Sequence, residues 1–171
     1  MASRTPCCGA PLLRGVCEEL AGKHMIFRAT FVGDSLEDDG MYYDALRERA
    51  NKGALVERIT FLSGVPNTQT PRIYSAHSIF VNLSASGMYD KTLFEAAACE
   101  CLVLASSRDF AERVDTRFVF AEGDARDLAS KLQALLSIPA SDHALWGRKL
   151  RSLAEQDNLR SLANHLAEEM A

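Results

Sequence analysis

The stretch SIFVNLSASGMYDKTLFEAAACECLVLASS, residues 78–107, decides the fold of this chain. It starts with an apolar strand, Ile79 to Val81, continues through a polar loop that ends at Asp90, and then forms an Ala-rich helix, Lys91 to Cys99. A second apolar strand, Leu102 to Leu104, follows. Two buried strands joined by a helix are typical of a parallel pair, and open α/β sheets bind ligands at the carboxyl ends of such strands. The polar loop is therefore the first candidate for a binding site.

The loop and the start of the helix favour an anionic ligand. Ser84 and Gly87 are small, so a ligand can approach the backbone closely, and Asp90 is suited to cap the helix. The unpaired amides of a helix start, with the positive end of the helix dipole, attract a phosphate. Glu95 lies about one turn further along, within reach of a sugar hydroxyl. In the alternative interpretation, Lys91 and Glu95 form a solvated ion pair worth a few tenths of a kcal/mol. The residues alone leave both interpretations open.

This stretch resembles the carboxyl-terminal, donor-binding half of a retaining nucleotide-sugar glycosyltransferase of the GT-B fold, the group 1 family. The positions in register with the family's pattern are Ser84, Glu95-Ala96, Ala98-Cys99 and Val103 to Ser106, and Asp90-Lys91-Thr92 resembles a subset of the family that has an Asp-Lys before this helix. The chain departs from the pattern at Gly87, where the family usually has an acid, and at Leu102, where it has a Pro. It also has Glu100 in place of the Gly that ends the helix, so the favoured left-handed terminating residue is missing.

The resemblance implies a site for a nucleoside-diphosphate sugar, in which Glu95 contacts ribose or sugar hydroxyls. The positions implied for the phosphate and sugar region are Ser84, Gly87, Lys91 and Thr92, and those implied for the nucleotide are Gly33, Gly64 and Val65. Arg4 stands for the family's diphosphate-binding arginine, but no Lys follows it at the family's spacing. Backbone contacts to the base leave no side-chain signature, so the sequence does not specify the nucleotide.

The rest of the chain alternates strand and helix patterns. Further strands are expected at 25–32, 59–62 and 118–120, and helices at 11–20, 41–52, 71–76, 109–114, 125–136, 142–155 and 159–170. We therefore expect one Rossmann-like α/β domain over residues 11–171, with about five parallel strands and helices on both faces, after a short irregular amino end (1–10) that holds a reduced first strand. The residues expected to cover the sheet, or to form an apolar patch for a partner, are Trp146, Leu150, Leu162 and Leu166. His77 is expected to be structural.

Composition excludes several other classes of protein. The chain has 171 residues, of which 47% are hydrophobic and 25% charged, and a net charge of −4, as in an ordinary soluble domain without an electrostatic footprint for nucleic acid. No apolar run is long enough to span a membrane, and the amino end lacks the apolar core of a secretory signal. The five unevenly placed cysteines predict neither a disulfide framework nor a metal site. We expect a cytoplasmic protein without a cofactor, and peripheral contact with a membrane is compatible with this sequence.

The resemblance implies that the chain binds the sugar donor and acts with a separate amino-terminal acceptor domain, as part of a transferase of the hexosyltransferase type that is not active alone. The departures from the family pattern favour a second hypothesis, a catalytically inactive interaction or regulatory module derived from the same fold. A third hypothesis, an unrelated doubly wound signalling domain, lacks the acidic cluster that such a phosphoacceptor site requires.

Overall fold

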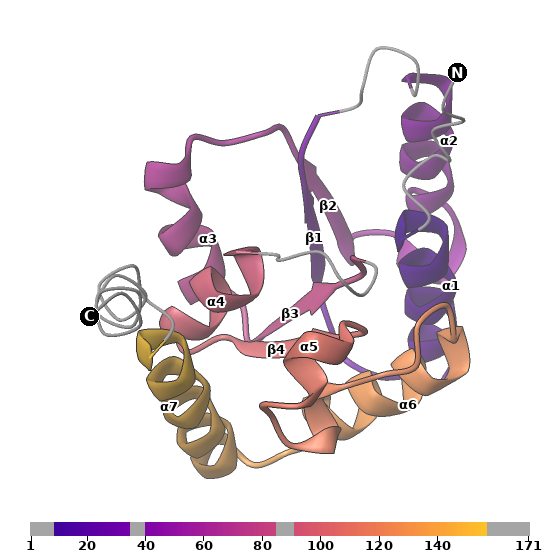
Figure 1. Cartoon of the computed structure of the whole chain (residues 1–171). Coiled ribbons are helices and arrows are strands. Elements are labelled where there is room, and N and C mark those ends of the chain that lie inside the picture. Colours follow the sequence, from indigo (N-terminus) through magenta and orange to yellow (C-terminus); the bar gives the residue numbers. More distant parts are fainter. Residues whose placement is uncertain (1–8, 35–39, 85–90, 157–171) are drawn as a thin grey trace, which may run out of the picture.

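The computed structural model describes residues 9–34, 40–84 and 91–156 (Figure 1). Its strands are β1 (Ala29–Val32), β2 (Ile59–Leu62), β3 (Ile79–Asn82) and β4 (Leu102–Ala105). Its α-helices are α1 (Gly9–Gly22), α2 (Gly40–Ala50), α3 (Thr70–Ser75), α4 (Lys91–Ala98), α5 (Arg108–Ala111), α6 (Ala125–Leu136) and α7 (Ala140–Gln156). The described residues also form the short 3-10 helices η2 (Gly53–Leu55), η3 (Asn67–Gln69) and η4 (Thr116–Phe118). The predicted alternation of strands and helices is confirmed, and the predicted helix 159–170 lies outside the described residues.

The strands are parallel and form two separate pairs. Ala29 of β1 lies opposite Ile59 of β2, and Ile79 of β3 lies opposite Leu102 of β4. A single parallel bridge joins Ala105, at the end of β4, to Val119. The α/β class is confirmed, but the described residues hold four strands and this bridge rather than five strands. The short edge strand predicted at 118–120 is confirmed only as this bridge at Val119, because η4 takes up the chain as far as Phe118.

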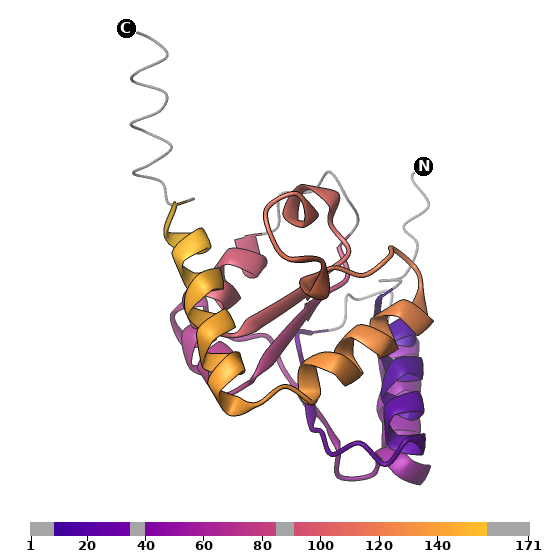
Figure 2. The same ribbon diagram turned by 90° about the horizontal axis from the view of Figure 1, so that it is seen from below.

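Helices cover the strands on two sides. In Figure 1, α1, α2 and α6 lie on one side of the strands, and α3, α4 and α7 lie on the other. Figure 2 shows the same two layers from below. The contacts agree, since α1 packs on α6 while α4 packs on both α3 and α7. This is the layered arrangement that a βαβ sequence pattern predicts.

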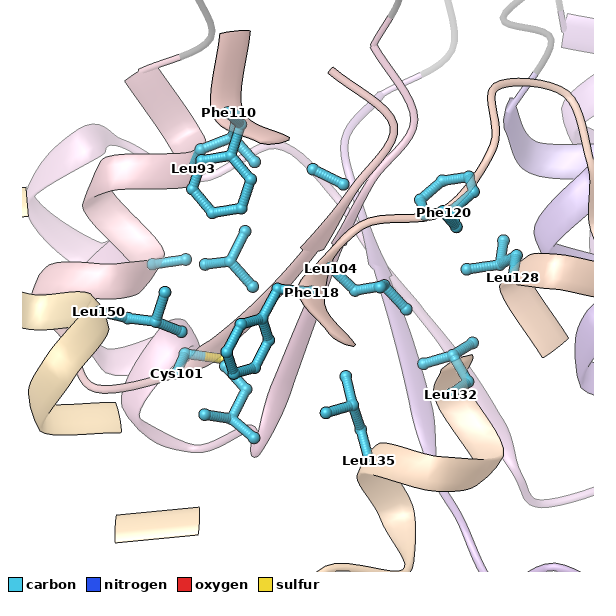
Figure 3. Packing of buried hydrophobic residues seen from close by; sticks show 14 of the residues in the cluster. Leu93, Cys101, Leu104, Phe110, Phe118, Phe120, Leu128, Leu132, Leu135 and Leu150 are labelled. Carbon is cyan, nitrogen blue, oxygen red and sulfur yellow. The ribbon is translucent and has the colours of Figure 1, made fainter. Parts of the chain in front are cut away.

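The main hydrophobic core surrounds β4. All four residues of this strand, Leu102 to Ala105, are fully buried (0% exposed). Figure 3 shows the side chains packed around them, among them Leu93 of α4, Leu135 of α6 and Leu150 of α7. A parallel strand covered on both faces needs apolar side chains in both directions, which explains the continuous apolar run LVLA. A smaller cluster of Cys17, Ala21 and Leu55 lies beside β1 and β2.

The first strand is shorter than the sequence suggests. Residues 25–28 are not extended in a ladder, although their β-branched and aromatic side chains predict a strand from Met25 onwards. The guanidinium of Arg58 donates to the carbonyl oxygen of Met25 at 2.6 Å and lies over the ring of Phe27, 5.4 Å from its centroid. A side chain therefore takes the backbone acceptor that a neighbouring strand would need, and the prediction is wrong for these four residues.

Glu100 ends α4 in the way that a glycine usually does. Its φ angle is 59°, in the left-handed region, its amide donates to Ala97 O at 2.9 Å, and the amide of Cys101 donates to Ala96 O at 3.1 Å. This pair of bonds is a Schellman motif. A left-handed non-glycine residue costs roughly 1–2 kcal/mol. The Glu100 carboxylate also pairs with Arg151 of α7 at 3.2 Å.

Helix α7 covers the core. Of the two alternatives expected for its apolar residues, this is the one in which they cover the sheet. Leu150 is 3% exposed, and the ring of Trp146 meets the ring of Phe118 edge to face at 5.5 Å between centroids. Arg117 and Lys149 lie over the indole at 4.1 and 4.3 Å from its centroid. Leu162 and Leu166 lie outside the described residues. In the part of the chain that the structure describes, no helix combines the length and the apolar character needed to cross a membrane.

Candidate functional site

Several polar residues and glycines follow directly after strands. Gly33 comes after β1, Gly64 follows the end of β2 by two residues, Ser84 follows β3 and Ser106 follows β4. Each of these positions therefore lies at the carboxyl end of its strand. Because the strands of each pair are parallel, the two carboxyl ends of a pair lie at the same edge. Carboxyl ends of strands are where ligands bind in open α/β folds.

The turns after β1 and β2 converge on each other. The amide of Gly33 donates to Leu62 O at 3.0 Å, and Gly33 has a φ of 144°, which only glycine adopts readily. The carboxylate of Asp34 lies against Gly64, where a Cβ atom would be 2.6 Å from the Asp34 Oδ2 atom. Two of the residues predicted to contact the nucleotide are thus neighbours, and each is a glycine for a reason of geometry. Val65, which follows Gly64 in the sequence, is half-buried.

The turn after β3 is organised by Asn82, which is 5% exposed. Its Oδ1 atom accepts a hydrogen bond from the amide of Ser84 at 2.9 Å, and its Nδ2 atom lies 3.5 Å from the hydroxyl of Thr92 in the first turn of α4. The hydroxyl of Ser106, which is itself buried, donates to Ser84 O at 3.3 Å. The end of β3, the start of α4 and the end of β4 therefore form one hydrogen-bonded unit around Ser84.

The start of α4 carries both a cation and an anion. The Lys91 Nζ atom lies 3.6 Å from the Glu95 Oε1 atom, and the two side chains are 63% and 36% exposed. The ion pair of the alternative interpretation is therefore formed. Both groups are exposed enough to contact a ligand at the helix start, where the first amides of a helix have no partner within the helix.

A hollow of about 520 Å³ adjoins this turn. Ser106 lines it and also bonds to Ser84, so the hollow and the turn share one residue. The charged side chains that line it are Arg108, Glu122, Asp127 and Lys131. Two of them bond to backbone, since Asp127 accepts from the amide of Ala121 and Lys131 donates to Thr116 O, both at 2.7 Å.

The structure brings most of the predicted site residues to two places. Gly33 and Gly64 meet at one, and Ser84 and Thr92 meet at the other, where Lys91 and Glu95 lie on the same helix. Gly87, Arg4 and the proposed cap Asp90 lie outside the described residues. Sequence reasoning did not assign Asn82, Asp34 or Ser106 to the site. For Asn82 the sequence does carry a signal, because it is a polar residue at the end of an apolar strand, directly after Val81.

His77 and Cys101 have structural surroundings. The two ring nitrogens of His77 bond to Ile73 O at 2.7 Å and to the hydroxyl of Thr30 at 2.8 Å, which supports the structural role expected of it. Burial raises the pKa of the Cys101 thiol to about 12, which keeps it protonated and unreactive. Within residues 9–34, 40–84 and 91–156, no group of three His, Cys, Asp or Glu side chains is placed to hold a metal ion.

A sequence model of the family "Glycosyl transferases group 1" matches residues 10–137. The match covers most of the chain, including every strand and the helices α2 to α6. This chain therefore belongs to the group 1 glycosyltransferases. No curated protein sequence shows significant similarity to it.

Solved glycosyltransferase structures share its fold. HepE of Anabaena, solved with UDP and glucose, has a TM-score of 0.78 and 19% identity, and the match covers 99% of this chain and 46% of HepE. A glycosyltransferase from Rickettsia africae has a TM-score of 0.78 and 20% identity, over 99% of this chain and 45% of its own. The catalytic domain of cholesterol-alpha-glucosyltransferase from Helicobacter pylori has a TM-score of 0.71 and 15% identity, over 92% of this chain and 96% of that domain. The chain thus spans about half the length of the first two proteins, as one half of a GT-B fold does.

Proposed function

We propose that this domain binds the nucleoside-diphosphate part of a sugar donor at the carboxyl ends of its strands, for glycosyl transfer together with an amino-terminal acceptor domain. The observation that carries the proposal is the hydrogen-bonded unit of Asn82, Ser84 and Thr92, which sets a turn of small residues against the start of α4. HepE, which has the same fold, was solved with UDP and glucose and also with UDP-glucose.

The residues at the carboxyl ends of the strands would act electrostatically. A nucleoside diphosphate leaves with added negative charge, and fixed N–H and hydroxyl donors stabilise such charge. The first amides of α4 and the hydroxyls of Ser84 and Thr92 would supply these donors, while Lys91 would add a positive charge at the same helix start. Glu95, one turn further on, would accept hydrogen bonds from ribose or sugar hydroxyls. Gly33, Gly64 and Val65 would contact the nucleotide through their backbone.

The second hypothesis, an inactive interaction or regulatory module, has one specific observation in its favour. Lys91 and Glu95 contact each other at 3.6 Å, so each satisfies part of the other's charge. An exposed pair of this kind is worth only about 0.3–0.5 kcal/mol, and a diphosphate can displace it at little cost. The contact therefore lowers donor affinity slightly without excluding a donor.

Calorimetric titration of the chain with UDP, GDP and ADP tests the proposal. We expect saturable binding of at least one of them, weakened about 10-fold or more in Glu95→Ala, because a hydrogen bond to a charged group contributes about 1.5–3 kcal/mol. Glu48→Ala is the matched control, since Glu48 on α2 also forms an exposed i,i+4 ion pair, at 2.6 Å with Lys52, which lies two residues beyond the end of that helix. That variant should bind as the parent does. Absence of binding for all three nucleotides would contradict the proposal and favour the inactive module.

Activity, partner and location complete this proposal. We expect transfer only when the acceptor domain is present, because GT-B chemistry takes place between two domains and this chain spans about half of HepE. A cytoplasmic location stays a prediction from the sequence.

A further inference from the structure

We propose that Asp34 selects guanine as the base of the donor nucleotide, so that the donor is a GDP-sugar. The inference rests on the proposed function, because it names the base that the nucleotide site would accept. Its grounds are the place of the Asp34 carboxylate, the hydrogen bonds that this carboxylate can still accept, and the pattern of N–H groups on the nucleobases.

Asp34 lies at the carboxyl end of the pair β1–β2. It follows Gly33, whose amide donates to Leu62 O at 3.0 Å, so the turn after β1 is tied to the end of β2. Its carboxylate reaches Gly64, since a Cβ atom built on Gly64 would lie 2.6 Å from the Asp34 Oδ2 atom and 3.5 Å from its Cγ atom. A carboxylate therefore lies directly against one of the two glycines that are proposed to contact the nucleotide, and next in sequence to the other.

The Asp34 carboxylate is available to a ligand. The residue is exposed, and no group in residues 9–34, 40–84 and 91–156 forms a hydrogen bond or an ion pair with its side chain. The other acid of the candidate site, Glu95, contacts Lys91 at 3.6 Å. An ionised carboxylate only accepts hydrogen bonds, at about four positions on its two oxygens. Asp34 therefore attracts the N–H and O–H groups of a ligand and repels its acceptor oxygens.

The position of Asp34 decides which part of the donor it meets. The phosphates are proposed to lie at the start of α4, beside Ser84 and Thr92, and α4 packs on the pair β3–β4. The pair β1–β2 is the neighbour of that pair, since Thr30 of β1 bonds to His77, two residues before β3, at 2.8 Å (Figure 1). The base is the part of a nucleoside diphosphate that lies farthest from its phosphates. The base is therefore the part that extends toward β1–β2 and Asp34.

Phosphate and ribose are poorer partners for this carboxylate. A carboxylate and a diphosphate repel each other because both are negative. The ribose lies between the phosphates and the base, and Glu95 on α4, one turn beyond the helix start, is the acid closer to it. The base is thus the remaining group for Asp34 to recognise.

Guanine is the base whose edge matches a carboxylate. Its N1–H and its N2 amino group are adjacent donors that point in the same direction, so one carboxylate accepts from both, as it does from the parallel N–H groups of arginine. Uracil has a single N–H between two carbonyl oxygens, which a carboxylate repels. In adenine and cytosine the amino group adjoins a ring nitrogen that is itself an acceptor. Asp34 therefore favours guanine by attraction and disfavours the other bases by repulsion.

Calorimetric titration of the chain and of Asp34→Asn with GDP, IDP, UDP and ADP tests this assignment. IDP probes a single group, because its base is guanine without the N2 amino group. We expect the parent chain to bind GDP about 10-fold or more tightly than the other three, the effect of one hydrogen bond to a charged group. Asp34→Asn replaces one acceptor oxygen by an NH2 group. It should bind GDP about 10-fold more weakly, lose most of its preference for GDP over IDP, and bind UDP no more weakly than the parent does.

Asp142→Asn is the matched control. It removes the same charge from the first turn of α7, next to His143, whose imidazole bonds to Ser78 O before the start of β3. This position is at the opposite end of the strand from the candidate site, so the variant should bind all four nucleotides as the parent does.

Three results would overturn the assignment while leaving the proposed function in place. The first is UDP or ADP binding as tightly as GDP in the parent chain, and the second is equal binding of GDP and IDP. The third is an Asp34→Asn variant that loses affinity for all four nucleotides by the same factor, which would place the carboxylate at the ribose that they share. Absence of binding for all four would contradict the proposed function itself, and the base assignment with it.

Discussion

The contact between α7 and the end of α4 gives a prediction whose size follows from the structure. Gly147 is buried on α7, and a Cβ atom built on it would lie 2.7 Å from the carbonyl oxygen of Glu100 and 3.3 Å from the Glu100 Cβ atom. The obstructing oxygen is backbone, in a turn held by the hydrogen bonds that end α4. Gly147→Ala therefore forces either the turn or α7 to move.

The expected magnitude is the difference of two terms. Overpacking of a closely packed contact costs about 1–3 kcal/mol, while replacing a glycine by alanine inside a helix gains about 1 kcal/mol. The net effect of Gly147→Ala should be a loss of about 1 kcal/mol in the free energy of unfolding, within the span of roughly 0 to 2 that these terms allow. Gly15→Ala is the matched control, because Gly15 lies inside α1 with no heavy atom within 4 Å of the added Cβ atom. It should gain about 1 kcal/mol.

Equilibrium unfolding in urea measures both variants, with the slope m checked for constancy. Both substitutions gain the same helix propensity. The difference between their changes in the free energy of unfolding is therefore the steric cost at Gly147, about 1–3 kcal/mol. If both variants change stability by the same amount and in the same direction, α7 does not pack against Glu100 as described.

Three further predictions concern single side chains. Asn82→Ala leaves the amide of Ser84 without its 2.9 Å acceptor, so it should lower the free energy of unfolding by about 1–3 kcal/mol and speed exchange of that amide; unchanged exchange would contradict the bond. The carboxylate of Asp124 caps α6 by accepting hydrogen bonds from two amides. Asp124→Ala should therefore lower the free energy of unfolding in urea by about 1 kcal/mol, whereas Asp124→Ser should keep most of the stability that the cap contributes. Burial raises the pKa of Cys17 from 9.0 to about 11, so the unfolded thiol ionises first and the free energy of unfolding should fall as pH rises from 9 to 11. Cys17→Ala should reduce that fall, and an identical pH dependence in both proteins would count against the burial of this thiol.

Most of the strands and helices could be predicted from the sequence, because the hydrophobic pattern of each one lies within its own residues. The apolar run of β4 and the helical repeat of Ala125 to Leu136 correspond to burial on both faces and on one face respectively, and both are found where they were expected. Residues 25–28 could not be assigned correctly, because a distant arginine, Arg58, takes the carbonyl of Met25. Contacts between residues far apart in the sequence leave no trace in a periodicity.

Glu100 and the arrangement of the strands show a second limit. A glycine missing from the end of α4 suggested a helix without its usual terminator, but Glu100 itself adopts the left-handed conformation, where Arg151 and α7 hold it. The separation into two strand pairs was also not visible, since each strand has an ordinary strand pattern. Pairing is a property of neighbours in space rather than of the strand's own residues.

The candidate site was predicted in part. The resemblance identified positions that the structure brings together, Gly33 with Gly64 and Ser84 with Thr92. It did not indicate that Asn82 links the second pair, because a family pattern records which residues recur and not which hydrogen bonds they make. The ion pair of Lys91 and Glu95 was one of the two interpretations that the sequence left open, and the structure contains it.

Amide chemical shifts during a UDP titration test most directly whether a nucleoside diphosphate binds along the carboxyl ends of the strands. The largest shifts should fall on Gly33, Gly64, Ser84 and Thr92. At the opposite end of β3, where the imidazole of His143 bonds to Ser78 O at 2.9 Å, the shifts should be negligible. Shifts confined to that opposite end, or spread evenly over the chain, would contradict binding at the carboxyl ends.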